Sequence, residues 1–273
     1  MDRAVGGQWL MLGRWGGATA CCSGAPARAP RMGRALILML MLALGRPVAA
    51  AIDFDWQSVD AVLGRHVVDG RVDYPGLRSD PAFAGLVAAV AGTDLAGATR
   101  DERLAFYINA YNLLAIQGIL NGRSPATGPG KWRYFYLDRY AVAGERISLN
   151  TLEQKRLRTL GEPRIHFAIV CASRSCPLLG SRAWQPSRLD AQLDAAARRF
   201  VNDPQRNRFD LAAGEARLSK IFQWFGEDFL AAGSVSAWLA DYVADPALAD
   251  ALRRGALTVK YLPYDWSLNG TPP

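Results

Sequence analysis

A histidine and two cysteines lie close together in the middle of this chain, at His166, Cys171 and Cys176. A cysteine thiolate is a nucleophile, and a nearby histidine is a base that can activate it. Pro177 favours a helix that starts directly after Cys176, and the positive end of such a helix would lower the pKa of the thiol, as would the charge of Arg174. These residues predict a catalytic site with Cys176, or else Cys171, as the nucleophile and His166 as the base.

The same two cysteines also allow a structural interpretation. In an oxidising compartment Cys171 and Cys176 would form a disulfide, and the chain-entropy model gives such a short loop a stabilisation of about 2 kcal/mol. A third possibility is that both residues are unreactive buried thiols. Thiol–disulfide exchange is disfavoured, because four residues separate the cysteines and this is not the spacing of the usual redox pair. His166 would then be an ordinary buried histidine. The residue types alone leave these interpretations open.

The segment that carries the histidine is predicted to be a strand. Residues 164–170 form a β-branched and aromatic run, on which His166 faces away from Ile165 and Phe167. A straight strand would keep His166 too far from Cys176 for a hydrogen bond. The turn after the strand must therefore fold back if the two side chains are to meet.

A helix predicted over residues 100–120 is the element that would support such a site. Thr99 and Glu102 form a capping box at its start, and Asn121 and Gly122 supply its end. Apolar residues occur nearly all the way round this helix, which is typical of a helix buried at the centre of a protein.

Two asparagines, Asn109 and Asn112, lie three positions apart on this helix and therefore share a face. Buried amides need hydrogen-bond partners, so polar groups must meet them. One interpretation is a structural network that clamps a loop. The other is that the amides orient a catalytic imidazole or donate to an oxyanion. Tyr107 and Tyr111 of the same helix are candidate binding residues.

The C-terminal residues 261–269 are too aromatic for a frayed end, and we expect them to dock on the core. Asp265 could orient His66 or His166 and so complete a set like the serine protease triad. A turn cap is the alternative role for this carboxylate. Trp266 is a further candidate binding residue.

The remaining pattern predicts an α+β fold, a helix-rich single domain over residues 51–273 with the central helix packed on a small, mostly antiparallel sheet. Strands and helices alternate too rarely for a doubly wound sheet. Further expected elements are helices over residues 54–67, 81–91, 187–200, 221–230, 235–243 and 246–254, a short helix capped by Asn150 and Glu153, hairpins over 133–149 and 207–218, and a last strand over 257–262.

Residues 1–50 are typical of a secretory signal peptide. A basic flank precedes the apolar run Ala35–Leu44, and small residues follow up to Ala50. This run is shorter than the roughly 20 residues that span a bilayer, so we expect no transmembrane segment after signal removal. Met32 is a possible true start, which would make residues 1–31 an extension. The expected location is outside the cytoplasm, in the periplasm or secreted.

The charge of the chain is uneven, which bears on its partners. The formal net charge is +7, but the first fifty residues hold six arginines and one aspartate, so the rest carries only +2. A groove for nucleic acid would need its positive charge on the folded part, so we expect no nucleic-acid partner. Phosphate-loop, dinucleotide, metal-helix and nucleophile-elbow motifs are absent from the sequence, and we expect no cofactor and no metal. A small molecule or a peptide is the expected partner.

Five stretches of the chain are informative when taken together: Asp69–Tyr74, Leu104–Asn112, His166–Leu178, Leu218–Phe222 with Trp224, and Tyr264–Asn269. Together they resemble the domain-of-unknown-function family 547, which occurs in exported bacterial proteins and in plant proteins with a leucine-zipper-like part. The family has no established activity, and its layout resembles that of papain-like and transglutaminase-like cysteine enzymes. Those enzymes place the nucleophilic cysteine at the start of the central helix, whereas this helix carries Asn109 and Asn112. The resemblance thus implies that the nucleophile has moved to the turn with Cys171 and Cys176, or that the site is a non-catalytic relic.

Two functions follow as hypotheses. The first is a cysteine-dependent hydrolase or acyl transferase acting on amide or thioester bonds, with Cys176 or Cys171 as nucleophile and His166 as base. Asn109 or Asp265 would orient that base. The alternative is a non-catalytic periplasmic binding module that has a Cys171–Cys176 disulfide and an aromatic-lined cleft.

Overall fold

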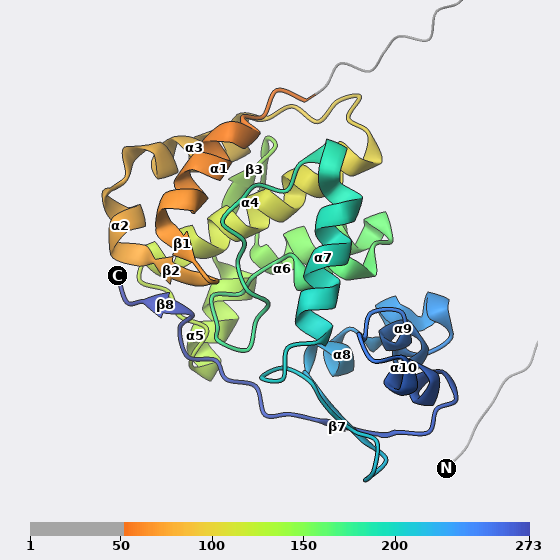
Figure 1. The fold of residues 1–273 in the computed structure, drawn as a ribbon. Coiled ribbons are helices and arrows are strands. Elements are labelled where there is room, and N and C mark those ends of the chain that lie inside the picture. The colour runs from red at the N-terminus through yellow and green to blue at the C-terminus, as the bar shows by residue number, and fades with distance from the viewer. Residues whose placement is uncertain (1–51) are drawn as a thin grey trace, which may run out of the picture. The chain divides into compact units, whose positions relative to one another are not determined.

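Helix α4 (Arg100–Leu120) lies at the centre of the computed structural model, which describes residues 52–273 (Figure 1). It begins and ends at the predicted residues. The capping box is present, because Thr99 accepts a hydrogen bond from the Glu102 amide and the Glu102 carboxylate accepts one from the Thr99 amide. Every residue from Leu104 to Ile116 is buried, as expected for a helix that is apolar on all sides. The expected signal peptide, residues 1–50, lies outside the described residues.

The other helices lie before or after α4 in the chain. Before α4 come α1 (Trp56–His66), α2 (Tyr74–Ser79) and α3 (Pro81–Gly92), each capped by an aspartate side chain. An aspartate at this position accepts a backbone N–H that the first turn leaves unpaired. The later helices are α5 (Gly128–Trp132), α6 (Leu149–Leu152), α7 (Leu189–Val201), α8 (Ile221–Trp224), α9 (Val235–Ala240) and α10 (Pro246–Arg253).

The strands form three small sheets in which antiparallel pairs outnumber parallel ones. In the first sheet Val67 pairs with Val72 and Val72 with Gly270, in the second Tyr140 pairs with Ile147, and in the third Ala216 lies between partner strands. The α+β, helix-rich fold class is therefore confirmed. The sheets are β1 (Val67–Val68), β2 (Arg71–Asp73) and β8 (Gly270–Thr271); β3 (Tyr140–Val142) and β4 (Glu145–Ile147); and β5 (Arg208–Asp210), β6 (Glu215–Leu218) and β7 (Thr258–Tyr261).

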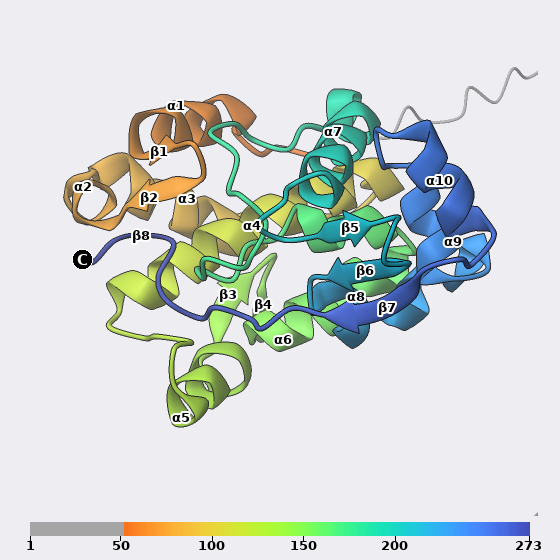
Figure 2. The same ribbon diagram turned by 60° about the horizontal axis from the view of Figure 1, so that its bottom comes forward.

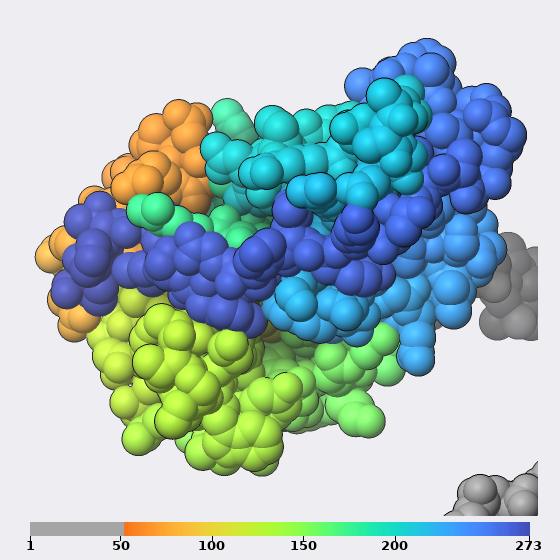
Figure 3. Space-filling model, turned by 90° about the horizontal axis from the view of Figure 1, so that it is seen from below, coloured from red at the N-terminus to blue at the C-terminus, as the bar shows by residue number. Residues whose placement is uncertain are grey.

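Residues 258–271 cross one face of the molecule from β7 to β8 (Figure 2). Seen from that face, this C-terminal segment runs between the β5–β6 hairpin and the part of the chain around α5 (Figure 3). The amide of Leu262 donates to the Leu218 carbonyl, and the Tyr74 hydroxyl donates to Asn269. The prediction that the aromatic C-terminal residues dock on the core is confirmed.

Three local predictions are wrong. Residues 164–170 do not form a strand; Pro163–Phe167 is a 3₁₀ helix, with the side chain of Glu162 as its cap. No helix follows Pro177, so Cys176 lies at no helix N-terminus. The short helix α6 is capped by Ser148 and not by Asn150.

Two further segments differ in part from the prediction. The hairpin expected over residues 133–149 begins only at Tyr140, because Arg133–Leu137 forms a π-helical turn after α5. A second π-helical turn, Glu153–Leu157, follows α6. None of the helices in residues 52–273 has the length and apolar character that crossing a bilayer needs.

Candidate functional site

The two buried asparagines of α4 clamp the backbone of distant segments. The Asn112 amide donates to the Ala168 carbonyl at 3.0 Å, and its oxygen accepts the Val170 N–H at 2.8 Å. Asn109 does the same with Trp184, donating to its carbonyl at 2.8 Å and accepting its N–H at 3.1 Å. The interpretation as a structural network is therefore confirmed for both residues. Their carboxamides bond backbone groups and do not orient the imidazole of His166.

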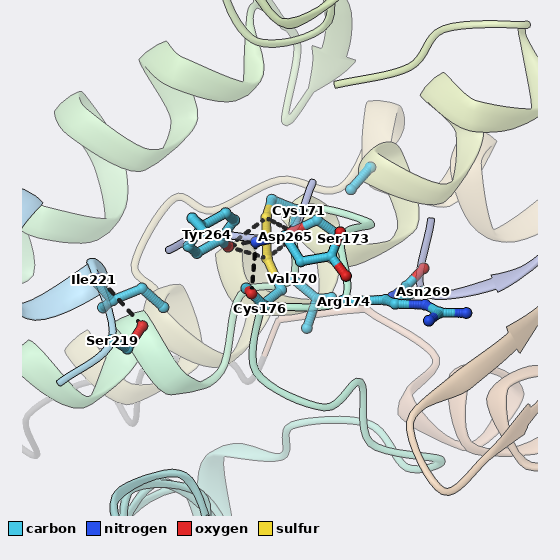
Figure 4. Close-up of a disulfide and its surroundings, with 12 residues drawn as sticks. Val170, Cys171, Ser173, Arg174, Cys176, Ser219, Ile221, Tyr264, Asp265 and Asn269 are labelled. Carbon is cyan, nitrogen blue, oxygen red and sulfur yellow. Dashed lines mark hydrogen bonds between the residues drawn. A yellow bond between two sulfur atoms is a disulfide. The ribbon is translucent and has the colours of Figure 1, made fainter. Parts of the chain in front are cut away.

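Cys171 and Cys176 form a disulfide, which confirms the structural interpretation of the two cysteines. The Tyr264 hydroxyl lies 3.3 Å from each sulfur and 3.3 Å from the Ser173 hydroxyl (Figure 4). Between the cysteines, Ala172 has a left-handed backbone with φ of 59°, which is uncommon for a residue other than glycine. The Asn112 clamp, the disulfide and the C-terminal segment together hold this loop in shape.

The disulfide predicts a specific peptide map, because Arg174 provides a tryptic site inside the bridged loop. We expect digestion of the denatured, alkylated but unreduced protein to give peptides 165–174 and 175–182 joined as one species. Reduction should separate them into two peptides, each with one newly reactive cysteine, and lower the stability of the folded protein by about 2 kcal/mol. Mass spectrometry checks the map, and recovery of both peptides separately and alkylated before reduction would show free thiols.

The C-terminal segment holds the disulfide loop but brings no carboxylate to a histidine. The amide of Arg174 donates to the Ser267 carbonyl at 2.9 Å, while its side chain is exposed and points away from the disulfide (Figure 4). The Asp265 carboxylate accepts the N–H and the hydroxyl of Ser267. The expectation that Asp265 orients His66 or His166 is therefore wrong, and the alternative, a turn cap, is the role observed.

Asp228 is the residue that orients His166. Its carboxylate lies 2.7 Å from Nε2 of His166 and also accepts two hydrogen bonds from Arg158, at 2.5 and 2.7 Å. Although burial works in the opposite direction, the hydrogen bonds from His166 and Arg158 hold the pKa of Asp228 well below its usual range. Burial lowers the pKa of His166, against the effect of Asp228. Since an ionised carboxylate only accepts, Nε2 carries the proton, and the ring stacks on Phe225 with centroids 4.0 Å apart.

His166 and the disulfide line one cavity of about 440 Å³. Of the other predicted site residues Tyr111 and Trp266 also line it. Tyr107 instead lines a separate cavity of about 270 Å³ beside Arg103 and Arg156. We call the larger cavity the aromatic cavity. Four predicted site residues do not line it: Asn109, Asn112, Arg174 and Asp265. Its walls are Tyr111, Lys131, Phe135, Tyr136, Asn150, Glu153, Gln154, His166, Ile169, Cys171, Cys176, Pro177, Ile221, Trp224, Phe225, Tyr264 and Trp266.

Aromatic rings make up much of this wall and contact one another. Trp224, Tyr264 and Trp266 form a cluster with ring centroids 4.5 to 5.8 Å apart. Phe135 packs edge-on against Trp266 from the π-helical turn that follows α5. This turn packs on α4 because Tyr134 is accommodated where Gly118 has no side chain. Rings that pack on one another give a wall that is rigid as well as apolar.

Glu153, which the sequence pattern predicted only as a helix cap, lines the aromatic cavity. It begins the second π-helical turn and is 9% exposed, and its carboxylate has no hydrogen bond or ion pair with residues 52–273. Burial raises its pKa to about 7, and the nearby Asp228 charge adds to this shift while Arg158 opposes it. A signal existed in the sequence: Glu153 lies four residues from both Leu149 and Leu157, on an otherwise apolar stripe. π-Helical turns are rare and often occur at functional sites.

Lys131 brings the opposite charge to the same cavity. Its ammonium nitrogen lies 3.6 Å from the ring centroid of Trp266, a cation–π contact. Burial lowers the pKa of this lysine. The lysine side chain forms no ion pair within residues 52–273.

The family model described as "Protein of unknown function, DUF547" matches residues 95–201. Residues 95–201 belong to the DUF547 family. The DUF547 stretch contains α4, both π-helical turns, His166 and the disulfide. No curated protein and no solved structure matches the chain, so the likeness in layout to papain-like enzymes stays a prediction.

The aromatic cavity combines residues of the DUF547 stretch with residues that follow it. Glu153, His166 and the disulfide belong to the stretch, whereas Trp224 and Trp266 come after it. Asp228, which orients His166, also comes after it. Within residues 52–273 no three His, Cys, Asp or Glu side chains are placed to hold a metal ion together. The charged or titratable groups that line the cavity include the Glu153 carboxyl, the Lys131 ammonium group and the His166 imidazole, set among aromatic rings.

Proposed function

We propose that this protein is a binding module that takes a small organic molecule into the aromatic cavity. The observation that carries the proposal is the cavity itself, about 440 Å³ in volume, with rigid aromatic walls and a few polar groups. Pockets for small molecules typically have volumes of about 300–1,000 Å³ and combine mainly apolar walls with a small number of polar groups. A ligand with a flat apolar part matches these walls.

Binding fits the site better than cysteine-dependent hydrolysis or acyl transfer. Both sulfurs are in the disulfide, so neither is available as a thiolate. The groups within hydrogen-bond distance of the sulfurs are the Ser173 hydroxyl, the Tyr264 hydroxyl and the Cys171 amide. His166 uses Nε2 to bond Asp228. A nucleophile and its base must lie within hydrogen-bond reach, and the described residues contain no such cysteine–histidine pair.

Export of the protein is part of the proposal. The basic flank, the apolar run Ala35–Leu44 and the small residues up to Ala50 support a signal peptide. The disulfide also supports export, because such bonds persist in the periplasm and outside the cell and are rare in the cytosol. The ligand would then be a molecule of the cell envelope or its surroundings.

The binding proposal can be tested by filling the cavity. Asn150 lines the cavity and makes no side-chain hydrogen bond within residues 52–273, so Asn150→Trp adds a ring there without removing a contact of the core. We expect indole and 3-phenylpropan-1-ol to bind the wild type in ligand-observed NMR titrations. Asn150→Trp should weaken that binding at least tenfold.

The matched control adds the same ring elsewhere. Leu211 is 44% exposed at the turn between β5 and β6 and does not line the cavity. Leu211→Trp should bind both probes as the wild type does. If the wild type binds neither probe, or if Asn150→Trp binds them unchanged, the aromatic cavity is not the binding site.

A further inference from the structure

We propose that the ligand of the aromatic cavity is a small zwitterion of the amino-acid type. Its ammonium group would pair with Glu153 and its carboxylate with Lys131, while its side chain contacts the aromatic wall. The inference rests on the binding function proposed above and adds the chemical class of the ligand.

Two opposite charges on one cavity wall carry this inference. Neither Glu153 nor Lys131 has an ion-pair partner in the described part of the chain, and they do not pair with each other. The neighbouring charges are satisfied, because Asp228 binds both Arg158 and His166. Among the charged side chains that line the cavity, Glu153 and Lys131 are therefore the two without a partner in residues 52–273.

An unpaired charge away from bulk water is unfavourable until a group of opposite charge reaches it. Glu153 is 9% exposed and lies among rings, so a ligand ammonium group would supply the partner that the protein does not. The ammonium group of Lys131 sits over Trp266, a contact that leaves its N–H donors free for a carboxylate. A ligand with only one charge would leave the other residue unpaired.

The aromatic wall suits the rest of such a ligand. Tyr111, Tyr264 and Trp266 present rings to the cavity, and these rings can contact an apolar side chain or the face-on approach of a cation. The disulfide contributes a further apolar surface. Three parts of an amino acid, its ammonium group, carboxylate and side chain, thus each have a counterpart on the wall.

Four compounds that share one phenyl ring test the inference. They are L-phenylalanine, which is a zwitterion, 2-phenylethylamine, 3-phenylpropionate and the neutral 3-phenylpropan-1-ol. At pH 8, where Glu153 is mainly ionised, we expect calorimetric or NMR titration to show L-phenylalanine binding at least tenfold tighter than each of the others. The dipeptide L-phenylalanyl-glycine separates the sources of the zwitterion: tighter binding of the dipeptide than of the amino acid indicates a short peptide.

Single variants assign each charge of the ligand to one residue. Glu153→Gln should reduce the affinity for L-phenylalanine to that for 3-phenylpropionate, and Lys131→Gln should reduce it to that for 2-phenylethylamine. The exposed residues Glu227 and Lys155 lie outside the cavity wall, so Glu227→Gln and Lys155→Gln are matched controls that should bind as the wild type does.

The possible failures are distinguishable. If 3-phenylpropan-1-ol binds as tightly as L-phenylalanine, the zwitterion inference is wrong while the binding module stands. Preferential binding of the amine alone or of the carboxylate alone would also overturn it, in favour of a site for a single charge. Absence of binding by every probe would contradict the proposed function itself.

Discussion

Replacing Glu153 with glutamine should stabilise the folded protein at pH 8 by about 3 kcal/mol and change its stability little at pH 4. Burial among aromatic rings raises the pKa of this carboxyl from its ordinary 4.5 to about 7. Each pKa unit corresponds to about 1.36 kcal/mol. The ionised carboxylate is therefore a source of instability in the wild type, and the neutral amide of similar shape removes it.

The direction of the pH dependence follows from proton binding. Between pH 4.5 and about 7 the folded state holds a proton on Glu153 that the unfolded state has lost. The contribution of this group to stability therefore falls as the pH rises through that interval and stays constant above it. The charges of Arg158 and Asp228 act on this carboxyl, and His166 and Lys131 line the same cavity.

Urea unfolding of wild type and Glu153→Gln at several pH values from 4 to 8 measures this effect as a difference. The titrations of other groups, such as His166 and Asp228, occur in both proteins and largely cancel. Glu227→Gln removes an exposed carboxylate and should stay within about 0.5 kcal/mol of the wild type throughout. A constant difference between wild type and Glu153→Gln from pH 4 to pH 8 would contradict a raised pKa at this position.

We expect a residue such as Glu153 to destabilise the free protein if its partner of opposite charge is supplied by the ligand. Binding of a cationic group would favour the ionised form of Glu153 and lower its pKa. The stability gained by Glu153→Gln and the affinity lost by it should therefore occur together at pH 8, which separates a binding role from general damage to the fold.

Local patterns in the sequence predicted the elements that local forces determine. The start of α4 follows from the capping box at Thr99 and Glu102 and its end from Asn121 and Gly122, while its central position follows from apolar residues on every side. The clamps of Asn109 and Asn112 followed from the cost of burying an amide without partners. The disulfide was one of the alternatives that the spacing of Cys171 and Cys176 allowed.

The errors occurred where distant residues decide the local structure. The run from Arg164 to Val170 has the residue types of a strand, but no strand within residues 52–273 pairs with it. Its backbone groups at Ala168 and Val170 are satisfied by the side chain of Asn112, so a sheet partner is unnecessary. Pro163 starts the 3₁₀ helix that forms there instead. A short apolar run does not by itself distinguish these outcomes.

The site residues that were not predicted from the sequence are distant from His166 along the chain. Asp228 reaches His166 from a 3₁₀ helix that follows α8, and no local motif connects the two residues. Lys131 is recognisable as a cavity residue only through its contact with Trp266. Of these residues only Glu153 could have been recognised from the sequence, because it is an acidic residue on the apolar stripe between Leu149 and Leu157.

Replacing Asn112 with alanine should lower the free energy of unfolding by about 3 kcal/mol. The substitution leaves the Val170 N–H and the Ala168 carbonyl without their partner in a buried place, where each unpaired group costs about 1–3 kcal/mol. Because these groups lie between His166 and the disulfide, the amide proton of Val170 should also exchange faster with solvent. Asn109→Ala should act in the same direction through the two backbone groups of Trp184.

Gln117→Ala is the matched control for these variants, because it removes a carboxamide from the same helix. The Gln117 amide donates only to the side chain of Asn121 at the exposed end of α4, so its loss should cost no more than about 0.5 kcal/mol. Urea unfolding and hydrogen exchange at Val170 are the measurements. If Asn112→Ala matches Gln117→Ala in stability and leaves exchange at Val170 unchanged, the clamp does not hold the wall of the cavity. A selective loss at Asn112 would show that this wall depends on a side chain of the central helix that never touches the ligand.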